Sequence, residues 1–259
     1  MELYKFSSLD DKRLGWFEGM LVRSDLYFSY PYQFNDPFEY RPRFTLSAKT
    51  TDPALLKLKA RALLRRLGTS TAQKDRASRM PLTDVVRIMR ELYRSPDRGQ
   101  RRVQLFCMMS TRTRPLAWAH YANGHRGACL HLDSQRLPYE ARQVHYESDY
   151  PEIPILDELD SNEAFRRLLH VKAPEWEYEG EYRSARYLPD GQPLDHPHWQ
   201  NQLIRAKSNV ITGVTLGARI SPEHQAAVLD MVRRRVQAVP VWKAEPDKER
   251  FALGFTKIG

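Results

Sequence analysis

The sequence predicts an α+β fold, in which a mixed or antiparallel sheet is flanked by helices and carries a basic helical insertion. Strand patterns outnumber the crossover helices that a doubly wound parallel sheet would need. The 259 residues are 41% hydrophobic and 28% charged, which suits one globular domain over residues 1–259. No apolar run approaches the ~20 residues of a membrane span, so no membrane partner is expected.

The N-terminal part alternates strands and helices. The pattern predicts a strand over Glu2–Phe6, a helix over Asp10–Met20 and a strand over Asp25–Ser29. The segment Pro31–Pro42 contains three prolines and Asn-Asp-Pro at its centre, and is expected to be a loop.

Residues 48–102 are predicted to be the helical insertion, and they hold the excess of positive charge. Between Lys57 and Arg102 the chain has 14 Lys or Arg and four Asp or Glu, against a net charge of +9 for the whole chain. One helix is expected over Asp52–Leu67 and another from Thr83 onward. Five arginines at three- and four-residue steps share one face of the second helix: Arg87, Arg90, Arg94, Arg98 and Arg101. This stripe indicates a phosphate-binding surface or, alternatively, a solvated helix face.

The remaining elements follow the insertion. Apolar alternation and turn residues predict them in this order: strand Val103–Met109, helix Pro115–Asn123, strands Ala128–Asp133 and Arg142–Tyr146, helix Asn162–Val171, strands Trp176–Tyr187 and Val210–Leu216, helix Glu223–Val236 and strand Phe251–Thr256.

The cysteine and histidine content argues against disulfides and a metal site. Cys107 and Cys129 are too few for a disulfide scaffold or a four-thiolate zinc site. The histidine spacings lack a third ligand, so no metal is expected. The start of the chain has no basic segment followed by an apolar run, so no secretory signal is expected, and the cytoplasm is the default compartment.

Three dense polar and aromatic stretches stand out, and the first is Leu26–Glu39. A strand runs here into a loop rich in rings that also contains Asn35 and Asp36. One interpretation is a binding wall whose rings, such as Tyr30 and Tyr32, stack on a flat ligand. The other is a small aromatic core in which the Asx residues shape a turn.

The second stretch is Trp118–Asp133. A short helix with Trp118, His120 and Tyr121 is expected to end at Asn123-Gly124, before a strand. Packing on the sheet explains Trp118, whereas His120 is a polar group among large rings and is a candidate for a site.

The third stretch is Lys172–Arg183, in which glutamates alternate with Trp176, Tyr178, Gly180 and Tyr182. A strand would place all the carboxylates on one face. A solvated face explains the first two, Glu175 and Glu177. A site role is the better interpretation for Glu179 and Glu181, which lie beside Arg183.

Together these stretches resemble the family of uncharacterised bacterial proteins called DUF2971. The resemblance rests on the following residues: Leu3-Tyr-Lys-Phe6, Leu26-Tyr-Phe-Ser29, Phe34-Asn-Asp-Pro-Phe-Glu39, Trp118-Ala-His-Tyr121, Gly127-Ala-Cys129, and Lys172, Trp176, Tyr178, Glu179, Glu181 and Arg183. It extends to about Ile220, and the family name implies no activity.

A second resemblance is to ADP-ribosyltransferase-like folds, which use NAD and have a split sheet. Such folds begin with a Leu-Tyr-basic strand, continue to a Tyr/Ser strand that holds nicotinamide, and place a catalytic glutamate near a later strand. The matching positions here are Tyr4-Lys5, Phe28-Ser29 and Glu179-Gly-Glu181. Lys5 departs from the His or Arg that those enzymes carry.

This resemblance implies an enzyme that transfers ADP-ribose from NAD to a nucleic-acid or protein target, in bacterial defence or conflict. Glu181 would stabilise the positive charge that develops on the ribose, Glu179 would activate the acceptor, and His120 completes the catalytic set. The residues expected to contact NAD are Tyr4, Lys5, Ser29, Tyr30, Tyr32, Asn35, Asp36, Tyr121 and Arg183. The arginine stripe would dock the target. The alternative is a non-catalytic or nuclease-like module that binds nucleic acid through the same stripe.

Overall fold

The computed structural model of the chain describes residues 1–45, 100–154, 167–188 and 192–259, with the single positions 52, 54, 55, 58, 81, 84 and 87. These residues form two compact units. Unit 1 comprises Met1–Tyr30, Val103–Val144 and Glu175–Gly259, and unit 2 comprises Pro31–Arg102 and His145–Pro174.

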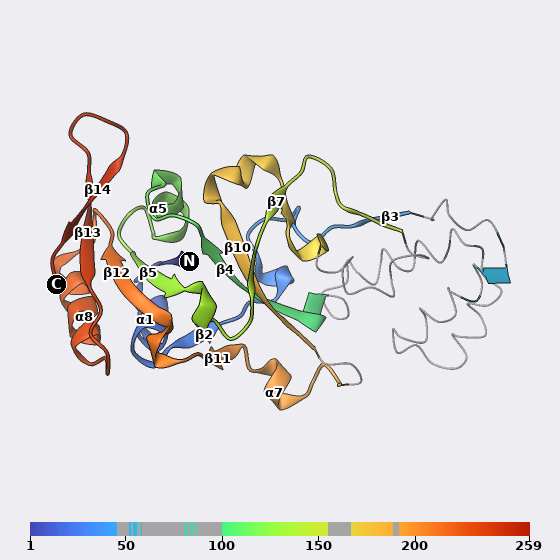
Figure 1. Cartoon of the computed structure of the whole chain (residues 1–259), viewed down its shortest axis with the longest axis horizontal. Helices are drawn as coiled ribbons and strands as arrows, with labels where there is room; N and C mark the ends of the chain where they lie inside the picture. The colour runs from blue at the N-terminus through green and yellow to red at the C-terminus, as the bar shows by residue number, and fades with distance from the viewer. Residues whose placement is uncertain are drawn as a thin grey trace. The chain divides into compact units, whose positions relative to one another are not determined.

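Unit 1 contains, among the described residues, an eight-stranded sheet in the order β14-β13-β12-β5-β1-β4-β10-β6 (Figure 1). Its strands are β1 (Glu2–Ser7), β4 (Val103–Met109), β5 (Ala128–Asp133), β6 (Ala141–Gln143), β10 (Glu181–Tyr187), β12 (Ile211–Leu216), β13 (Val241–Pro246) and β14 (Leu253–Lys257). Its helices are α1 (Asp11–Arg23), α5 (Pro115–Tyr121), α7 (Pro197–Gln200) and α8 (Pro222–Arg233). The short strands β2 (Asp25–Tyr27) and β11 (Leu203–Arg205) pair separately.

The sheet is mixed, which confirms the predicted α+β class. Neighbouring strands are antiparallel except β12 and β13, which are parallel. A parallel pair needs a crossover, and α8 supplies it. Ser221 caps the start of α8 by accepting a hydrogen bond from the backbone of His224, so the helix begins directly after β12 and a short turn.

Helices pack on both faces of this sheet. On one face, Phe17 and Leu21 of α1 and Val228 of α8 belong to the large buried core. On the other face, Trp118 of α5 packs edge-on against Phe6 of β1, with ring centroids 5.0 Å apart. The sheet is thus buried on both sides near its centre, and polar groups on it lie away from solvent.

Unit 2 is built from short elements. The strand β3 (Arg43–Thr45) pairs in parallel with β8 (Glu152–Pro154), and β7 (His145–Tyr146) pairs in parallel with β9 (Val171–Lys172). Two 3₁₀ helices, η1 (Pro31–Gln33) and η2 (Gln100–Arg102), also belong to it. In the described ranges of both units, no helix has the length and apolar character that crossing a membrane requires.

Several predicted elements differ from the structure. The expected strand Arg142–Tyr146 is two strands, β6 and β7, and Asp25–Ser29 is a strand only as far as Tyr27. The parallel strand β13 and the short α7 had no counterpart in the prediction. The two basic helices lie outside the described residues apart from isolated positions, and so does the start of the helix predicted over Asn162–Val171. The insertion over residues 48–102 therefore stays a prediction.

Candidate functional site

The third stretch is not the continuous strand that the sequence predicted. A 3₁₀ helix, η4 (Pro174–Glu179), precedes β10, and Gly180 joins them at φ +51°. The backbone N–H of Gly180 donates to the Glu177 carbonyl over 3.1 Å. A positive φ cannot continue a strand, so the four glutamates do not share one strand face. Glu175 and Glu177 are exposed, whereas the side chains beyond them turn inward.

Glu181 and Arg183 form a buried pair on β10. Arg183 donates from Nε to Oε1 of Glu181 over 2.7 Å and from Nη2 to Oε2 over 3.0 Å. Glu181 is 4% exposed and Arg183 is 2% exposed. A bidentate pair of this kind fixes the plane of the carboxylate.

Glu179 joins the second and third stretches. It is buried, and Tyr121 of α5 donates a hydrogen bond from its hydroxyl to Oε1 of Glu179 over 2.7 Å. The neighbouring His120 ring lies against Trp176 and Tyr178 of η4, with ring centroids 6.2 and 6.4 Å apart. Tyr121 and His120 of α5 thus contact η4, whose last residue is Glu179, and Glu181 follows at the start of β10.

The register of the sheet places Tyr4 on the same face as Glu181. Tyr4 pairs with Met109, and Met109 pairs with Glu181, so the three side chains leave the same face of adjacent strands. Two strand spacings of about 4.8 Å separate Tyr4 from Glu181. The Tyr4 hydroxyl donates to Glu2 over 2.7 Å, and burial together with this hydrogen bond raises the pKa of Tyr4.

Lys5 follows Tyr4 in β1, so its side chain leaves the opposite face. Its Nζ donates to the Cys107 carbonyl over 2.9 Å and lies 5.0 Å from the centre of the Phe106 ring. Burial lowers the pKa of Lys5, and the charges of Glu181 and Glu179 act in the opposite sense. Lys5 is therefore within electrostatic range of both carboxylates without sharing their face.

The first stretch is divided between the two units. In unit 1, Ser29 makes a backbone bridge to Leu105, and Tyr30 packs against Trp199 with ring centroids 6.4 Å apart. In unit 2, Asn35 is exposed and Asp36 is buried.

The arginine stripe is described only in part. Arg101 lies 5.9 Å from the centre of the Tyr32 ring, and Arg87 contacts Asp84 over 3.5 Å. Arg90, Arg94 and Arg98 lie outside the described residues. The stripe as a nucleic-acid surface stays a prediction.

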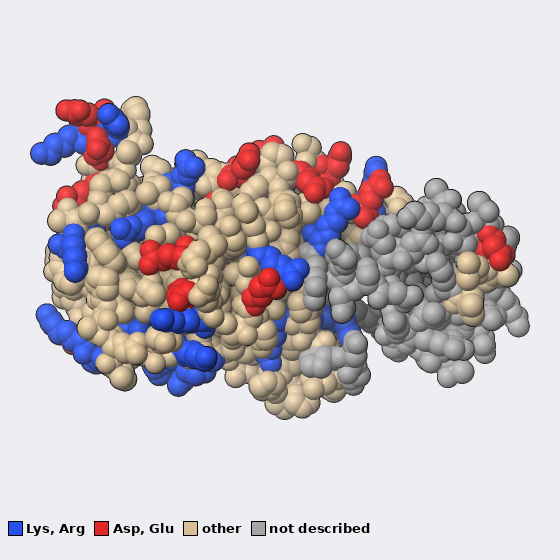
Figure 2. Space-filling view, viewed as in Figure 1, with Lys and Arg blue, Asp and Glu red and all other residues tan. Residues whose placement is uncertain are grey.

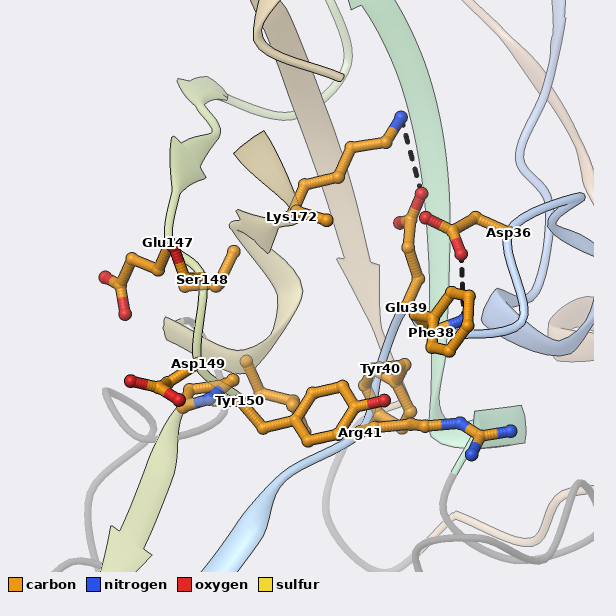
Figure 3. Close-up of a pocket in the computed structure, with 14 residues that line it drawn as sticks. Asp36, Phe38, Glu39, Tyr40, Arg41, Glu147, Ser148, Asp149, Tyr150 and Lys172 are labelled. Atoms are coloured by element: carbon orange, nitrogen blue, oxygen red, sulfur yellow. Dashed lines mark hydrogen bonds and ion pairs between the residues drawn. The ribbon is translucent and has the colours of Figure 1, made fainter. Parts of the chain in front are cut away.

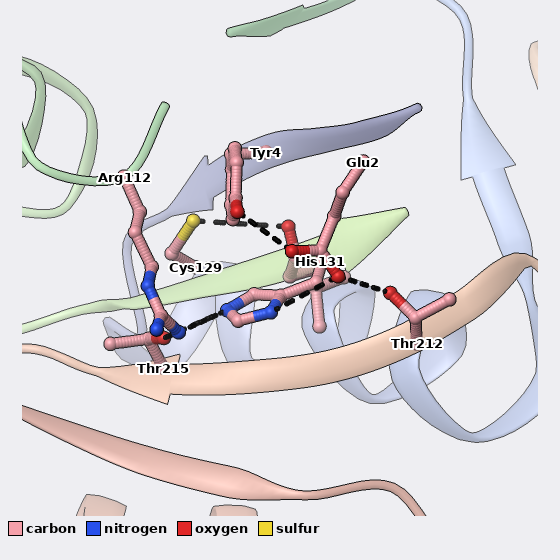
Figure 4. A network of polar contacts seen from close by, with 8 residues as sticks. Glu2, Tyr4, Arg112, Cys129, His131, Thr212 and Thr215 are labelled. Atoms are coloured by element: carbon pink, nitrogen blue, oxygen red, sulfur yellow. Dashed lines mark hydrogen bonds and ion pairs between the residues drawn. The ribbon is translucent and has the colours of Figure 1, made fainter. Parts of the chain in front are cut away.

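A second polar network on the α5 side of the sheet was missed from the sequence (Figure 4). His131 of β5 is 1% exposed, and its Nε2 lies 2.8 Å from Oγ1 of Thr215 and 3.0 Å from Nη1 of Arg112. Its Nδ1 lies 3.6 Å from a Glu2 oxygen, which also accepts a hydrogen bond from Thr212. The available signal was two polar residues, His131 and Thr215, at inward positions of otherwise apolar strands.

Aromatic rings enclose this network. Trp242 stacks on His131 with ring centroids 4.8 Å apart, and Arg112 lies 4.6 Å from the Trp242 ring and 4.4 Å from Phe255. A side chain at Gly213 would come within 2.6 Å of Trp242, so this close stacking requires glycine. Burial, followed by the charge of Arg112, lowers the pKa of His131 to about 4, which leaves the ring neutral.

The first and third stretches meet in unit 2. Lys172 contacts Glu39 over 3.4 Å, and both side chains are almost fully buried. Asp36 lies beside them on the wall of a pocket. The polar residues that carried the predicted resemblance thus form two buried centres, one in each unit.

One comparison with known proteins gives a match. Residues 117–184 match a family model described as Protein of unknown function (DUF2971). Neither the curated proteins nor the solved structures include a match to the chain. The likeness to ADP-ribosyltransferases stays a prediction from the sequence pattern. The predicted resemblance to DUF2971 is confirmed over residues 117–184, which contain Glu179, Glu181, Arg183 and the α5 residues that contact them.

Proposed function

We propose that the chain cleaves the bond between nicotinamide and ribose in NAD and transfers ADP-ribose to an acceptor. The observation that carries this proposal is the pair of buried carboxylates, Glu179 and Glu181, each held by a named donor. Cleavage of an N-glycosidic bond builds positive charge on the ribose, and an oriented carboxylate stabilises that charge. Arg183 sets the direction of the Glu181 carboxylate, so Glu181 is the residue assigned to this step.

Glu179 is assigned to the acceptor. The Tyr121 hydroxyl donates to Oε1 of Glu179 and so orients the carboxylate that would take a proton from an attacking hydroxyl or water. The rings of His120, Trp176 and Tyr178 provide flat surfaces beside these carboxylates, on which a nicotinamide or adenine ring could stack. Tyr4 lies on the same face, two strands from Glu181.

A polyanionic acceptor is the second part of the proposal. The positive charge of residues 57–102 would attract nucleic acid. On the face shown in Figure 2, further Lys and Arg side chains gather over the part of unit 1 where α1, α8 and β11 lie. Both features support docking of a phosphate backbone, and they equally support the simpler function of a nucleic-acid-binding module.

The test is nicotinamide release from NAD, followed by chromatography, with and without nucleic acid. Glu181→Gln is expected to lower kcat by about 100-fold or more, because it removes the charge while keeping a hydrogen-bond acceptor for Arg183. Glu177→Gln is the matched control, since this glutamate is exposed in the same segment, and full activity is expected. Wild-type protein that releases no nicotinamide, or a Glu181→Gln variant with wild-type turnover, would contradict the proposal.

Stability must be followed in the same variants. A buried Arg183 without its counter-charge costs about 3–5 kcal/mol. Glu181→Asp retains the charge but withdraws the carboxylate by about one methylene, and it is expected to stay folded with reduced turnover. Thermal unfolding gives the folded fraction of each variant. A comparison of kcat at equal folded fraction then distinguishes a loss of catalysis from a loss of folded protein.

A further inference from the structure

Unit 2 contains a pocket whose wall is formed by segments far apart in the sequence (Figure 3). Its volume is about 140 Å³. An apolar cavity of about this size accommodates a benzene molecule. The pocket therefore has room for one small planar or compact group, such as the end of a side chain, and not for a whole nucleotide.

The charge of the pocket is opposite to that of the chain. Four carboxylates line it, from Asp36, Glu39, Glu147 and Asp149, against the two cations of Arg41 and Lys172. The whole chain carries a net charge of +9. Lys172 contacts Glu39, and Arg167 contacts Glu147 over 3.7 Å. The acidic excess therefore rests on Asp36 and Asp149, against the single charge of Arg41, and it favours a positively charged occupant.

Asp36 gives the second, independent indication of a ligand. The residue is 7% exposed, and its Oδ1 accepts a hydrogen bond from the Phe38 backbone over 2.8 Å. Its Oδ2 is buried and has no hydrogen-bond partner among the described residues. Figure 3 shows this carboxylate on the pocket wall beside that of Glu39. A buried carboxylate oxygen without a donor is costly, and a donor in the pocket would satisfy it.

The aromatic rings at the pocket indicate which kind of donor it would bind. Tyr150 is 43% exposed and Phe38 is 62% exposed, and both line the pocket. An aromatic face attracts an organic cation but offers no ligand to a hard metal ion. In the described part of the chain, no three His, Cys, Asp or Glu residues are grouped as metal ligands. An organic cation is therefore favoured over a divalent metal.

We propose that this pocket binds a guanidinium group. A guanidinium is planar, donates through a fork that matches a carboxylate, and stacks on aromatic rings. Asp36 would accept from it through Oδ2, and Tyr150 would cover its face. The group could belong to a free arginine-like metabolite or to an arginine side chain of a peptide, and both present the same chemistry to the pocket.

The test is calorimetric titration of the full chain with agmatine, with the tripeptide Gly-Arg-Gly and with citrulline amide, whose side chain ends in an uncharged urea in place of the guanidinium. Agmatine or the tripeptide is expected to bind, and the stronger of the two identifies the source of the group. Citrulline amide is expected to bind at least tenfold more weakly. Equal binding of citrulline amide, stronger binding of Mg²⁺, or no binding of either guanidinium compound would overturn the proposal.

Two variants locate the binding. Asp36→Asn keeps the acceptor for the Phe38 backbone but removes the charge, and a loss of at least tenfold in affinity is expected. Glu249→Gln makes the same change of charge in the exposed hairpin of unit 1 and should bind like wild type. Tyr150→Ala removes a half-exposed ring without touching the buried pair, and about a threefold loss is expected. Wild-type affinity in both Asp36→Asn and Tyr150→Ala would place the ligand elsewhere.

Discussion

At the scale of single residues, the chain places ionisable side chains inside the sheet and supplies each with a specific partner. Arg183 pairs with Glu181, Tyr121 donates to Glu179, and His131 is held between Thr215 and Glu2. Such groups stabilise the fold only while their charge states match their surroundings. Of these residues, His131 has a lowered pKa, and its titration tests the geometry.

His131 gives a pH dependence of known sign. Its pKa is about 4 in the folded chain, against 6.5 for the free side chain. Between these values the unfolded state binds a proton that the folded state does not, so the free energy of unfolding falls as the pH falls from about 6.5 to 4. The loss from this one residue is about 3 kcal/mol at most.

Urea unfolding at a series of pH values measures this effect. His131→Gln is expected to flatten the decline between pH 6.5 and 4 relative to wild type. His198→Gln, at an exposed histidine, serves as control and should keep the wild-type slope. A His131→Gln profile parallel to that of wild type would show that His131 does not carry the dependence.

At the scale of elements, the join between η4 and β10 determines the geometry of the candidate site. Gly180 has φ +51°, and a Cβ there would collide with Oγ of Ser110. This residue allows Glu179 and Glu181 to lie two positions apart with both side chains buried. A regular strand would also put them on one face, but it would carry Glu177 inward with them.

A pair of glycine substitutions tests this reasoning. Gly180→Ala is expected to destabilise the chain by about 1–3 kcal/mol, through the positive φ and the collision with Ser110. Gly15→Ala lies in α1 with no atom within 4 Å of the added carbon, and a gain of about 0.5–1 kcal/mol is expected. Chemical denaturation of both variants provides the measurement. Equal effects of the two substitutions would contradict the role given to Gly180.

The sequence predicted elements with strong periodicity and missed those that depend on tertiary contacts. The strands Val103–Met109 and Ala128–Asp133 were predicted to the residue, because the first is apolar except for Gln104 and the second alternates with the period of a strand. The 3₁₀ helix η4 was misread as a strand, since alternating glutamates and rings imitate a period of two. The short β13 owes its place to the parallel pairing with β12, which no local pattern encodes.

The sequence predicted which residues belong to the candidate site, but not that they form separate groups. Glu179, Glu181, Tyr121 and Arg183 were selected by their density, and they form two contacting pairs, Tyr121 with Glu179 and Arg183 with Glu181. The His131 network was missed, because its polar residues are spread over β1, β5, β12 and the segment of Arg112. Only the register of the sheet brings these segments together.

At the scale of the whole molecule, the chain separates two kinds of chemistry. Unit 1 holds paired carboxylates inside a mixed sheet, and unit 2 holds an acidic pocket in a chain of net charge +9. Transfer of ADP-ribose is proposed for unit 1, and recognition of a guanidinium is proposed for unit 2. Because the second assignment is tested without NAD, either one can fail alone.

The central claim is that Tyr121 and Glu179 act as one unit beside Glu181 in cleaving NAD. A double-mutant cycle of kcat/KM for nicotinamide release, with Tyr121→Phe, Glu179→Gln and the combined variant, tests it most directly. Tyr121→Phe removes the hydrogen bond, and Glu179→Gln removes the carboxylate that this bond orients, so the combined loss should fall short of the product of the single losses by about fivefold or more. Fully multiplicative losses, or a wild-type chain that leaves NAD intact, would contradict the claim.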